Sequence, residues 1–212
     1  MPKLRCPSTT AHRLRPLLSV SMLLAPAVAT QAHPVYMDHV EHRVELTVGS
    51  TNIDISIELR FNEVQSLAER RRMDINRDNA ISQAECEGYL RRITGPLRTD
   101  FQLSCDGRPL ELILLYEPQI DFLGVNGVSP NHHVLKLSYF ARTPATVVKS
   151  TRKAVELAFE DRSWRGVPAL WLFAANARDG MDATTLPTTE ADSQPAGRDA
   201  PALVGRCRIK QV

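Results

Sequence analysis

The chain has 212 residues, of which 43% are hydrophobic and 24% are charged, with a formal net charge of +2. These fractions are close to soluble-protein averages, which excludes a largely disordered chain and a multi-span membrane protein. The length allows one β domain of ordinary size or two small domains. The densest basic cluster, Arg70-Arg71-Arg72, precedes an acidic segment and is typical of a solvated helix end, so the sequence gives no indication of nucleic-acid binding.

Residues 1–32 have the composition of an export signal. A basic start is followed by a short apolar stretch at residues 17–28, which Pro26 interrupts and which is shorter than a membrane span requires. Small residues at the spacing that a signal peptidase needs predict cleavage after Ala29 or Ala32. We therefore expect the mature chain to be exported, either periplasmic or secreted, and to lack a transmembrane span.

Residues 44–61 alternate between apolar and polar side chains, as a strand with one buried face requires. The alternation is strongest from residue 53 to residue 59 and weaker over residues 43–48. The turn-like sequence Gly49-Ser50-Thr51-Asn52 separates these two stretches. The pattern therefore predicts a β-hairpin.

The period of the pattern changes after this hairpin. Residues 62–73 place apolar side chains on one side, as an amphipathic helix requires. A second helix is predicted to begin near Ser82, where Ser82 and Glu85 have capping-box spacing, and to end at Gly95-Pro96. The sequence thus predicts a helix-loop-helix insertion at residues 62–95.

Strand-like segments resume after the insertion, separated by Gly, Pro, Asn and Asp. They are residues 101–105, 110–116, 134–142, 154–159 and 169–174. With the hairpin they make seven short strands, which favours a mainly β fold, an antiparallel β-sandwich-like domain over residues 33–212. Residues 179–201, rich in Thr, Ala, Asp and Pro, are predicted to form a flexible loop, and residues 203–212 to close the sheet.

Residues 74–85 place oxygen-bearing side chains at loop positions 1, 3, 5, 9 and 12. Calcium prefers roughly six to eight oxygen ligands, and this spacing lets several side chains converge with one backbone carbonyl. The candidate ligands are Asp74, Asn76, Asp78, the backbone carbonyl of Ala80, Ser82 through a water molecule, and Glu85 through both carboxylate oxygens. Three carboxylates in one loop repel one another without a cation, so we predict Ca²⁺ as the cofactor of this loop.

The loop and its two predicted helices resemble an EF-hand over about thirty residues. Ile81, at the eighth loop position, resembles the apolar residue that anchors such loops on their helices. Asn79 stands where the family has Gly, and Asn adopts the left-handed conformation more readily than most residues. Cys86 stands where the family has a larger apolar residue.

EF-hands generally work in pairs, and residues 179–190 have the length of a second loop but apolar residues at its third and fifth positions. We therefore expect a lone hand. Its affinity for calcium should lie in the range of roughly micromolar to millimolar. The role that we expect for the ion is structural, because it orders the inserted helices rather than acting as a switch.

Removal of the export signal leaves Cys86, Cys105 and Cys207, an odd number in a compartment that permits disulfides. A disulfide between Cys86 and Cys105 is one prediction, because it would tie the second helix to the next strand. The alternative is three small buried thiols, and the sequence does not choose between them.

The histidines offer a different metal chemistry. His33 is the N-terminal residue if cleavage follows Ala32, and an N-terminal amine with its own imidazole is a copper ligand. The other members of this alternative set are His39, His42, His132 and His133. The Ala-His-Pro start, followed by alternating strands and an acidic helical loop, also resembles the exported domains of bacterial nickel, cobalt and hydrogenase-accessory membrane proteins. That resemblance implies a periplasmic copper or nickel carrier or accessory domain with a membrane protein as its partner.

No enzyme motif of the G-x-S-x-G, H-E-x-x-H, Gly-rich phosphate-loop or C-x-x-C type is present in the sequence. Asp161, Trp164 and Arg165 follow a strand and indicate either a binding rim or a packed loop. Trp171 is predicted to lie in the core. We therefore expect a non-enzymatic, exported calcium-binding protein that binds or scaffolds a membrane protein or another exported protein.

Overall fold

The structure is a computed structural model that describes residues 38–149, 154–187 and 202–212. All of these residues belong to the second of two units, residues 34–212, and the fold described below is that of this unit alone. The predicted export signal, its cleavage site and His33 lie outside the described residues. So does most of the predicted flexible loop, from residue 188 to residue 201.

A six-stranded sheet contains the predicted hairpin. Its strands are β1 (Val40–Val48), β2 (Asn52–Phe61), β5 (Ile113–Leu114), β6 (Gln119–Phe122), β7 (His133–Arg142) and β9 (Ala169–Ala177). The order is β5-β7-β2-β1-β9, and β6 also pairs with β7. β1 and β2 pair antiparallel from Val48 opposite Ile53, so the predicted hairpin is confirmed. The parallel pairing of β1 with β9 is the exception to an otherwise antiparallel sheet.

A second, five-stranded sheet is antiparallel throughout. Its strands are β3 (Phe101–Cys105), β4 (Arg108–Leu110), β8 (Val155–Asp161), β10 (Met181–Thr185) and β11 (Leu203–Gln211), in the order β10-β11-β8-β3-β4. β10 corrects the prediction that residues 179–201 form a loop from their first residue onward. Residues 181–185 have weak strand character, but they pair with residues 207–211, a partner that local composition does not reveal.

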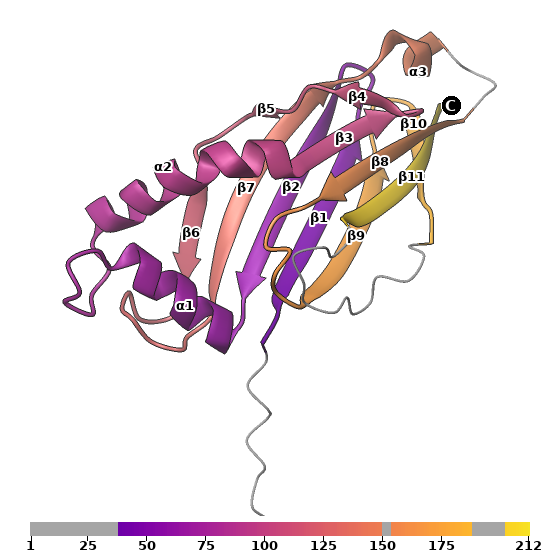
Figure 1. Ribbon diagram of the computed structural model, residues 1–212. Helices are drawn as coiled ribbons and strands as arrows, with labels where there is room; N and C mark the ends of the chain where they lie inside the picture. The colour runs from indigo at the N-terminus through magenta and orange to yellow at the C-terminus, as the bar shows by residue number, and fades with distance from the viewer. Residues whose placement is uncertain (1–37, 150–153, 188–201) are drawn as a thin grey trace, which may run out of the picture. The chain divides into compact units, whose positions relative to one another are not determined.

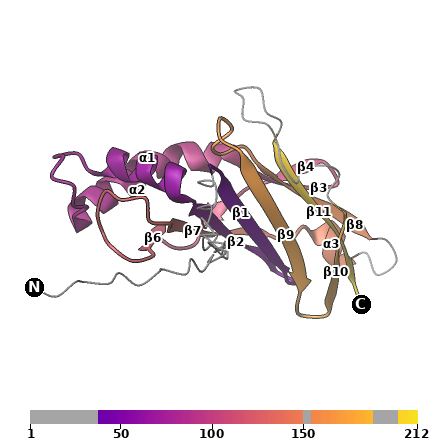
Figure 2. The same cartoon turned by 90° about the horizontal axis from the view of Figure 1, so that it is seen from below.

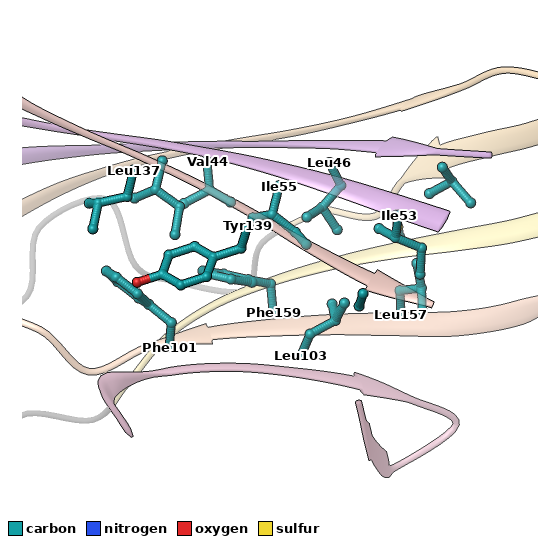
Figure 3. Close-up of a cluster of buried hydrophobic side chains, with 14 of the residues drawn as sticks. Val44, Leu46, Ile53, Ile55, Phe101, Leu103, Leu137, Tyr139, Leu157 and Phe159 are labelled. Carbon is teal, nitrogen blue, oxygen red and sulfur yellow. The ribbon is translucent and has the colours of Figure 1, made fainter. Parts of the chain in front are cut away.

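The two sheets, both mostly antiparallel, pack on a common apolar core, and the prediction of a mainly β fold is confirmed. Figure 3 shows Ile55 and Tyr139 of the six-stranded sheet facing Phe101 and Phe159 of the five-stranded sheet. Alternate residues of β1 and β2 are buried, because successive side chains of a strand point to opposite faces.

One close approach in this core depends on a missing side chain. A Cβ atom on Gly205 of β11 would lie 2.2 Å from the ring of Phe173 on β9. The Phe173 ring in turn stacks on Trp171, with 6.2 Å between the ring centroids. Glycine at this position therefore lets an aromatic layer of one sheet lie directly on the backbone of the other.

Two helices lie between β2 and β3, where the insertion was predicted, and a short third helix lies between β7 and β8. They are α1 (Glu63–Met73), α2 (Gln83–Asp100) and α3 (Ala145–Lys149). α2 leads directly into β3 (Figure 1), and α1 and α2 lie side by side near β6 (Figure 2). Among the described residues, no helix is long and apolar enough to cross a membrane.

α2 does not end at Gly95-Pro96, so that prediction is wrong. Pro96 removes one helical hydrogen-bond donor, yet the helix continues to Asp100. The last turn is retained because Leu97 is buried in the core between the sheets and its carbonyl accepts a hydrogen bond from Phe101 N–H. Burial of a leucine side chain contributes about 1.5–3 kcal/mol, enough to offset the lost hydrogen bond.

Candidate metal site

The segment between α1 and α2 is held at both ends by backbone contacts. Asp74 is the C-cap residue of α1, and its N–H donates to Arg70 O at 3.0 Å. At the other end, Ser82 and Glu85 form the capping box that the sequence predicts. Ser82 Oγ accepts a hydrogen bond from Glu85 N–H at 3.3 Å, and Glu85 Oε2 accepts one from Ser82 N–H at 3.0 Å. The predicted start of α2 is therefore confirmed.

Asp74 is buried and its carboxylate points into the loop. Asp74 Oδ1 accepts a hydrogen bond from Asp78 N–H at 3.2 Å, and Oδ2 accepts one from Asn79 N–H at 3.0 Å. The first oxygen ligand in the predicted set thus contacts the backbone four and five residues later along the chain.

Asn76 and Asp78 continue this inward arrangement. Asn76 Oδ1 accepts from Asp78 N–H at 2.9 Å, and Asp78 Oδ1 accepts from Ala80 N–H at 2.8 Å. The backbone reaches these positions through positive φ angles of 62° at Arg77 and 65° at Asn79. The left-handed conformation anticipated for Asn79 is confirmed, whereas that of Arg77 was not predicted.

Glu85, the last residue of the loop, contacts its beginning. Glu85 Oε1 accepts hydrogen bonds from Ile75 N–H at 3.0 Å and from Asn76 N–H at 3.3 Å. The hydrogen bonds from the backbone and side chain of Ser82, followed by those from Asn76 and Ile75, lower the pKa of the Glu85 carboxyl to about 2. Glu85 is therefore an ionised acceptor at neutral pH.

Ile81 is the apolar anchor that the sequence predicts. It is buried in a small cluster with Met73 of α1 and Tyr89 of α2, and Phe122 of β6 packs against that cluster. The loop is thereby attached to both helices and to the edge of the six-stranded sheet.

A buried polar group lies on the other side of this cluster. The carboxylate of Glu69 accepts a hydrogen bond from Tyr89 Oη at 2.6 Å. It also forms an ion pair with Arg72, whose Nη1 lies 2.5 Å from Glu69 Oε1. Burial and the adjacent Glu69 carboxylate raise the pKa of Tyr89. Next to them, Trp164 lines an apolar groove of about 510 Å³ together with Ile93 of α2.

The described residues contain no group of three or more His, Cys, Asp or Glu side chains close enough together to hold a metal ion. The oxygens of the loop are hydrogen-bonded to the loop backbone instead. A carboxylate has about four lone-pair sites, so Asp74 and Asp78, which accept two hydrogen bonds each, retain acceptor capacity, whereas Glu85 accepts four. The residues present fit a hard cation that prefers oxygen, since Asp74, Asn76, Asp78 and Glu85 offer only oxygen ligands.

Each described histidine of the alternative metal set contacts a different polar side chain. His42 is buried between the sheets, with Nδ1 2.7 Å from Asp161 Oδ2. His133 is also buried, with Nδ1 2.7 Å from Ser66 Oγ. The two others that the structure describes are partly exposed: His39 Nε2 is 2.7 Å from Asn62 Nδ2, and His132 Nε2 is 3.5 Å from Glu63 Oε1.

The environment of His133 keeps it neutral. Burial, followed by the positive charges of Arg70 and His132, lowers the pKa of His133 to about 3. Its ring stacks on Phe61, with 4.5 Å between the ring centroids. This histidine is part of the packing beneath α1.

Cys86, Cys105 and Cys207 are free thiols in the structure, so the predicted Cys86–Cys105 disulfide is not formed there. The physical reason is location: Cys86 packs against the cluster around Ile81, whereas Cys105 belongs to the core between the two sheets. The alternative, three buried free thiols, is correct for Cys105 and Cys207. Cys86 is also free but is only partly buried.

Asp161, at the end of β8, is packed, whereas Trp164 is half-buried at the groove and Arg165 is exposed, so the turn has both a packed and an exposed part. Asp161 is 1% exposed, and its Oδ1 accepts hydrogen bonds from Ser163 N–H at 2.8 Å and Ser163 Oγ at 2.6 Å. Trp164, at a positive φ of 47°, packs edge-on against Phe61. Trp171 is buried in the core as predicted.

The chain matches no protein-family model, and no curated protein matches it. Any function proposed for it therefore rests on its own residues.

Two positions at this site were missed by sequence reasoning. Arg70 was interpreted as part of a solvated helix end but is fully buried, whereas Arg71 and Arg72 are exposed. Gly127, far away in the sequence, forms a β-bridge with Ala80 of the loop. No periodic signal marks either position, because their partners come from a different part of the chain.

Proposed function

We propose that the chain is an exported protein that binds one Ca²⁺ in an EF-hand-like loop at residues 74–85, and that this site is structural, within a domain that binds or scaffolds another protein. The observation that carries the proposal is the way Glu85 closes the loop. Its Oε1 accepts hydrogen bonds from residues nine and ten positions earlier, while Asp74 accepts hydrogen bonds from the middle of the loop. Oxygens from both ends of the loop therefore face the same short stretch of backbone.

The charge of the loop supports a cation. Among the described residues, none of the three carboxylates of Asp74, Asp78 and Glu85 lies within ion-pair distance of a Lys, Arg or His side chain. The loop therefore carries negative charge that no basic side chain among the described residues offsets, and a divalent cation would offset it.

The ligands that we assign to calcium are all oxygens. Asp74, Asn76, Asp78 and Glu85 would contribute side-chain oxygens, Ala80 its carbonyl, and Ser82 a contact through water. When bound, the ion would neutralise the carboxylates and cross-link α1 to α2. Because Glu85 already accepts four hydrogen bonds, calcium binding through its two oxygens would exchange some of these contacts for contacts with the ion, while the helix ends stay in place.

The test is isothermal titration of the chelator-treated chain with calcium, repeated on Glu85→Gln and on Glu87→Gln. Gln at position 85 retains a carbonyl oxygen for the capping box but removes the charge and the bidentate carboxylate. Glu87, exposed on the same helix, is the matched control. We expect one site, with a dissociation constant of roughly micromolar to millimolar, that is lost in Glu85→Gln and retained in Glu87→Gln.

A copper and nickel titration of the same chain separates this proposal from the histidine alternative. A transition-metal carrier would give a copper or nickel isotherm that depends on His33 and no calcium isotherm, and that result would overturn the calcium proposal. Export is tested independently, by the N-terminal mass of the mature chain after expression with its own first 32 residues.

A further inference from the structure

Arg70 of α1 is fully buried and binds the last residue of β6 and the connection from β6 to β7, residues 122–132, which we call the bracing segment. Arg70 Nη1 donates to Val125 O at 2.6 Å and to Gly127 O at 2.8 Å, and Nη2 donates to His132 O at 3.1 Å. Its Nε donates to Ser66 Oγ at 3.1 Å on the same helix. Four of the five N–H donors of the guanidinium therefore have partners.

The bracing segment also contacts the loop at residues 74–85 directly, and Figure 1 shows it passing alongside α1. The backbone contacts are Ile81 N–H to Asn126 O at 3.2 Å, Val128 N–H to Asn79 O at 3.1 Å, and the β-bridge between Ala80 and Gly127. The middle of the calcium loop is thus paired with a strand-like piece of the β domain. The sequence predicts no second EF-hand loop to pair with residues 74–85. The bracing segment supplies a backbone partner for this loop instead.

Arg70 links these two sets of contacts through one cluster of side chains. Its Cζ lies 4.8 Å from the centre of the Phe122 ring, at the start of the bracing segment. Phe122 packs against the cluster that contains Ile81 and Met73. No carboxylate pairs with Arg70 among the described residues, although an unpaired buried charge is costly. The guanidinium is retained in this position by the carbonyls of the bracing segment.

We propose that the bracing segment is the second half of the calcium site, with Arg70 as the positioning residue, and that calcium binding and the order of residues 122–132 stabilise each other. This inference rests on the proposed function. If the loop binds calcium only in the shape that the bracing segment supports, then loosening the segment weakens calcium binding. The coupling is reciprocal, so calcium must stabilise the segment by the same free energy.

The first experiment compares calcium affinities of matched variants. Arg70→Met removes the donors of the guanidinium, and Arg71→Met changes its exposed neighbour. Gly127→Ala places a Cβ 3.0 Å from Asn79 O, pressing on the loop without touching a ligand side chain, whereas a Cβ on Gly166 meets nothing within 4 Å. We expect Arg70→Met and Gly127→Ala to weaken calcium binding on the order of tenfold, and Arg71→Met and Gly166→Ala to change it less than about twofold.

The second experiment measures amide hydrogen exchange of the wild-type chain with and without calcium. Calcium should slow exchange of Val128 and the rest of the bracing segment as well as of Ile81, while the β10–β11 hairpin is unchanged. This measurement decides the question even if Arg70→Met does not fold.

The outcomes separate the two proposals. If the wild-type chain does not bind calcium, the proposed function fails and the coupling fails with it. If the wild-type chain binds calcium but Gly127→Ala binds equally well, and calcium does not slow exchange in the bracing segment, the coupling alone is overturned.

Discussion

The interface between the two sheets and the helical end of the domain are stabilised by different interactions. Between the sheets, most contacts are between apolar side chains at alternate strand positions, such as those of Ile55 and Phe159, and the exception is the buried His42–Asp161 pair. At the helical end, the buried groups include Arg70, Glu69 and Asp74, which depend on hydrogen bonds of defined geometry. The first region tolerates changes that keep apolar volume, and the second tolerates few changes in polar groups. An inserted loop can thus be held on a β domain by buried polar contacts together with a small apolar cluster at the edge of the main core.

The largest effect should come from emptying the core between the sheets. Phe159 is fully buried, and its ring lies 6.0 Å from Phe101 and 6.4 Å from Trp171, measured between ring centroids. We expect Phe159→Ala to lower the free energy of unfolding by about 3–5 kcal/mol, through lost transfer energy and the cavity left behind. Urea unfolding followed by circular dichroism measures this.

Leu172, 39% exposed on β9, is the control for that change. Leu172→Ala should stay within about 0.5 kcal/mol of the wild type. If Phe159→Ala and Leu172→Ala cost the same, the core between the sheets is not what stabilises the domain, and the contrast with the helical end disappears.

A smaller effect should come from removing one polar contact at the helical end. Tyr89→Phe deletes the hydroxyl that donates to buried Glu69 while keeping the ring. Because a buried carboxylate then loses a donor, we expect a loss of about 1–3 kcal/mol in the free energy of unfolding. Tyr116→Phe, at a side chain that is 64% exposed, should cost almost nothing in the same urea experiment. Equal stability of Tyr89→Phe and the wild type would mean that this end is stabilised by packing alone.

The smallest effect concerns pH. His133 has a folded-state pKa lowered to about 3, so between about pH 6.5 and 3 the unfolded chain binds a proton that the folded chain does not. Stability contributed by neutral His133 is therefore complete above pH 6.5 and falls as the pH decreases, by about 1 kcal/mol between pH 7 and pH 5.5. The difference in unfolding free energy between the wild type and His133→Gln, measured at both pH values, should change by that amount. A pH-independent difference would show that His133 is not held neutral by burial.

Much of the fold was predictable from local patterns. The hairpin of β1 and β2, the capping box at Ser82 and the inward Ile81 each follow from residues close together in sequence. The path of α2 past Pro96 and the pairing of β10 with β11 were missed, because each depends on a contact with a distant segment. The burial of Leu97 outweighs a local helix-breaking signal, and no local signal reports it.

The sequence by itself determined the alternation that makes two sheets, the position of the inserted helices and the set of oxygen side chains in residues 74–85. These features depend on the spacing of residue types along the chain, and that spacing is different for a strand, a capped helix and a loop. Only the tertiary structure decided that Arg70 is buried rather than solvated, that Gly127 pairs with Ala80, and that Cys86 and Cys105 lie in different clusters. The physical reason is that a buried polar side chain is placed by its partners, and the carbonyls that bind Arg70 lie more than fifty residues away from it in the sequence.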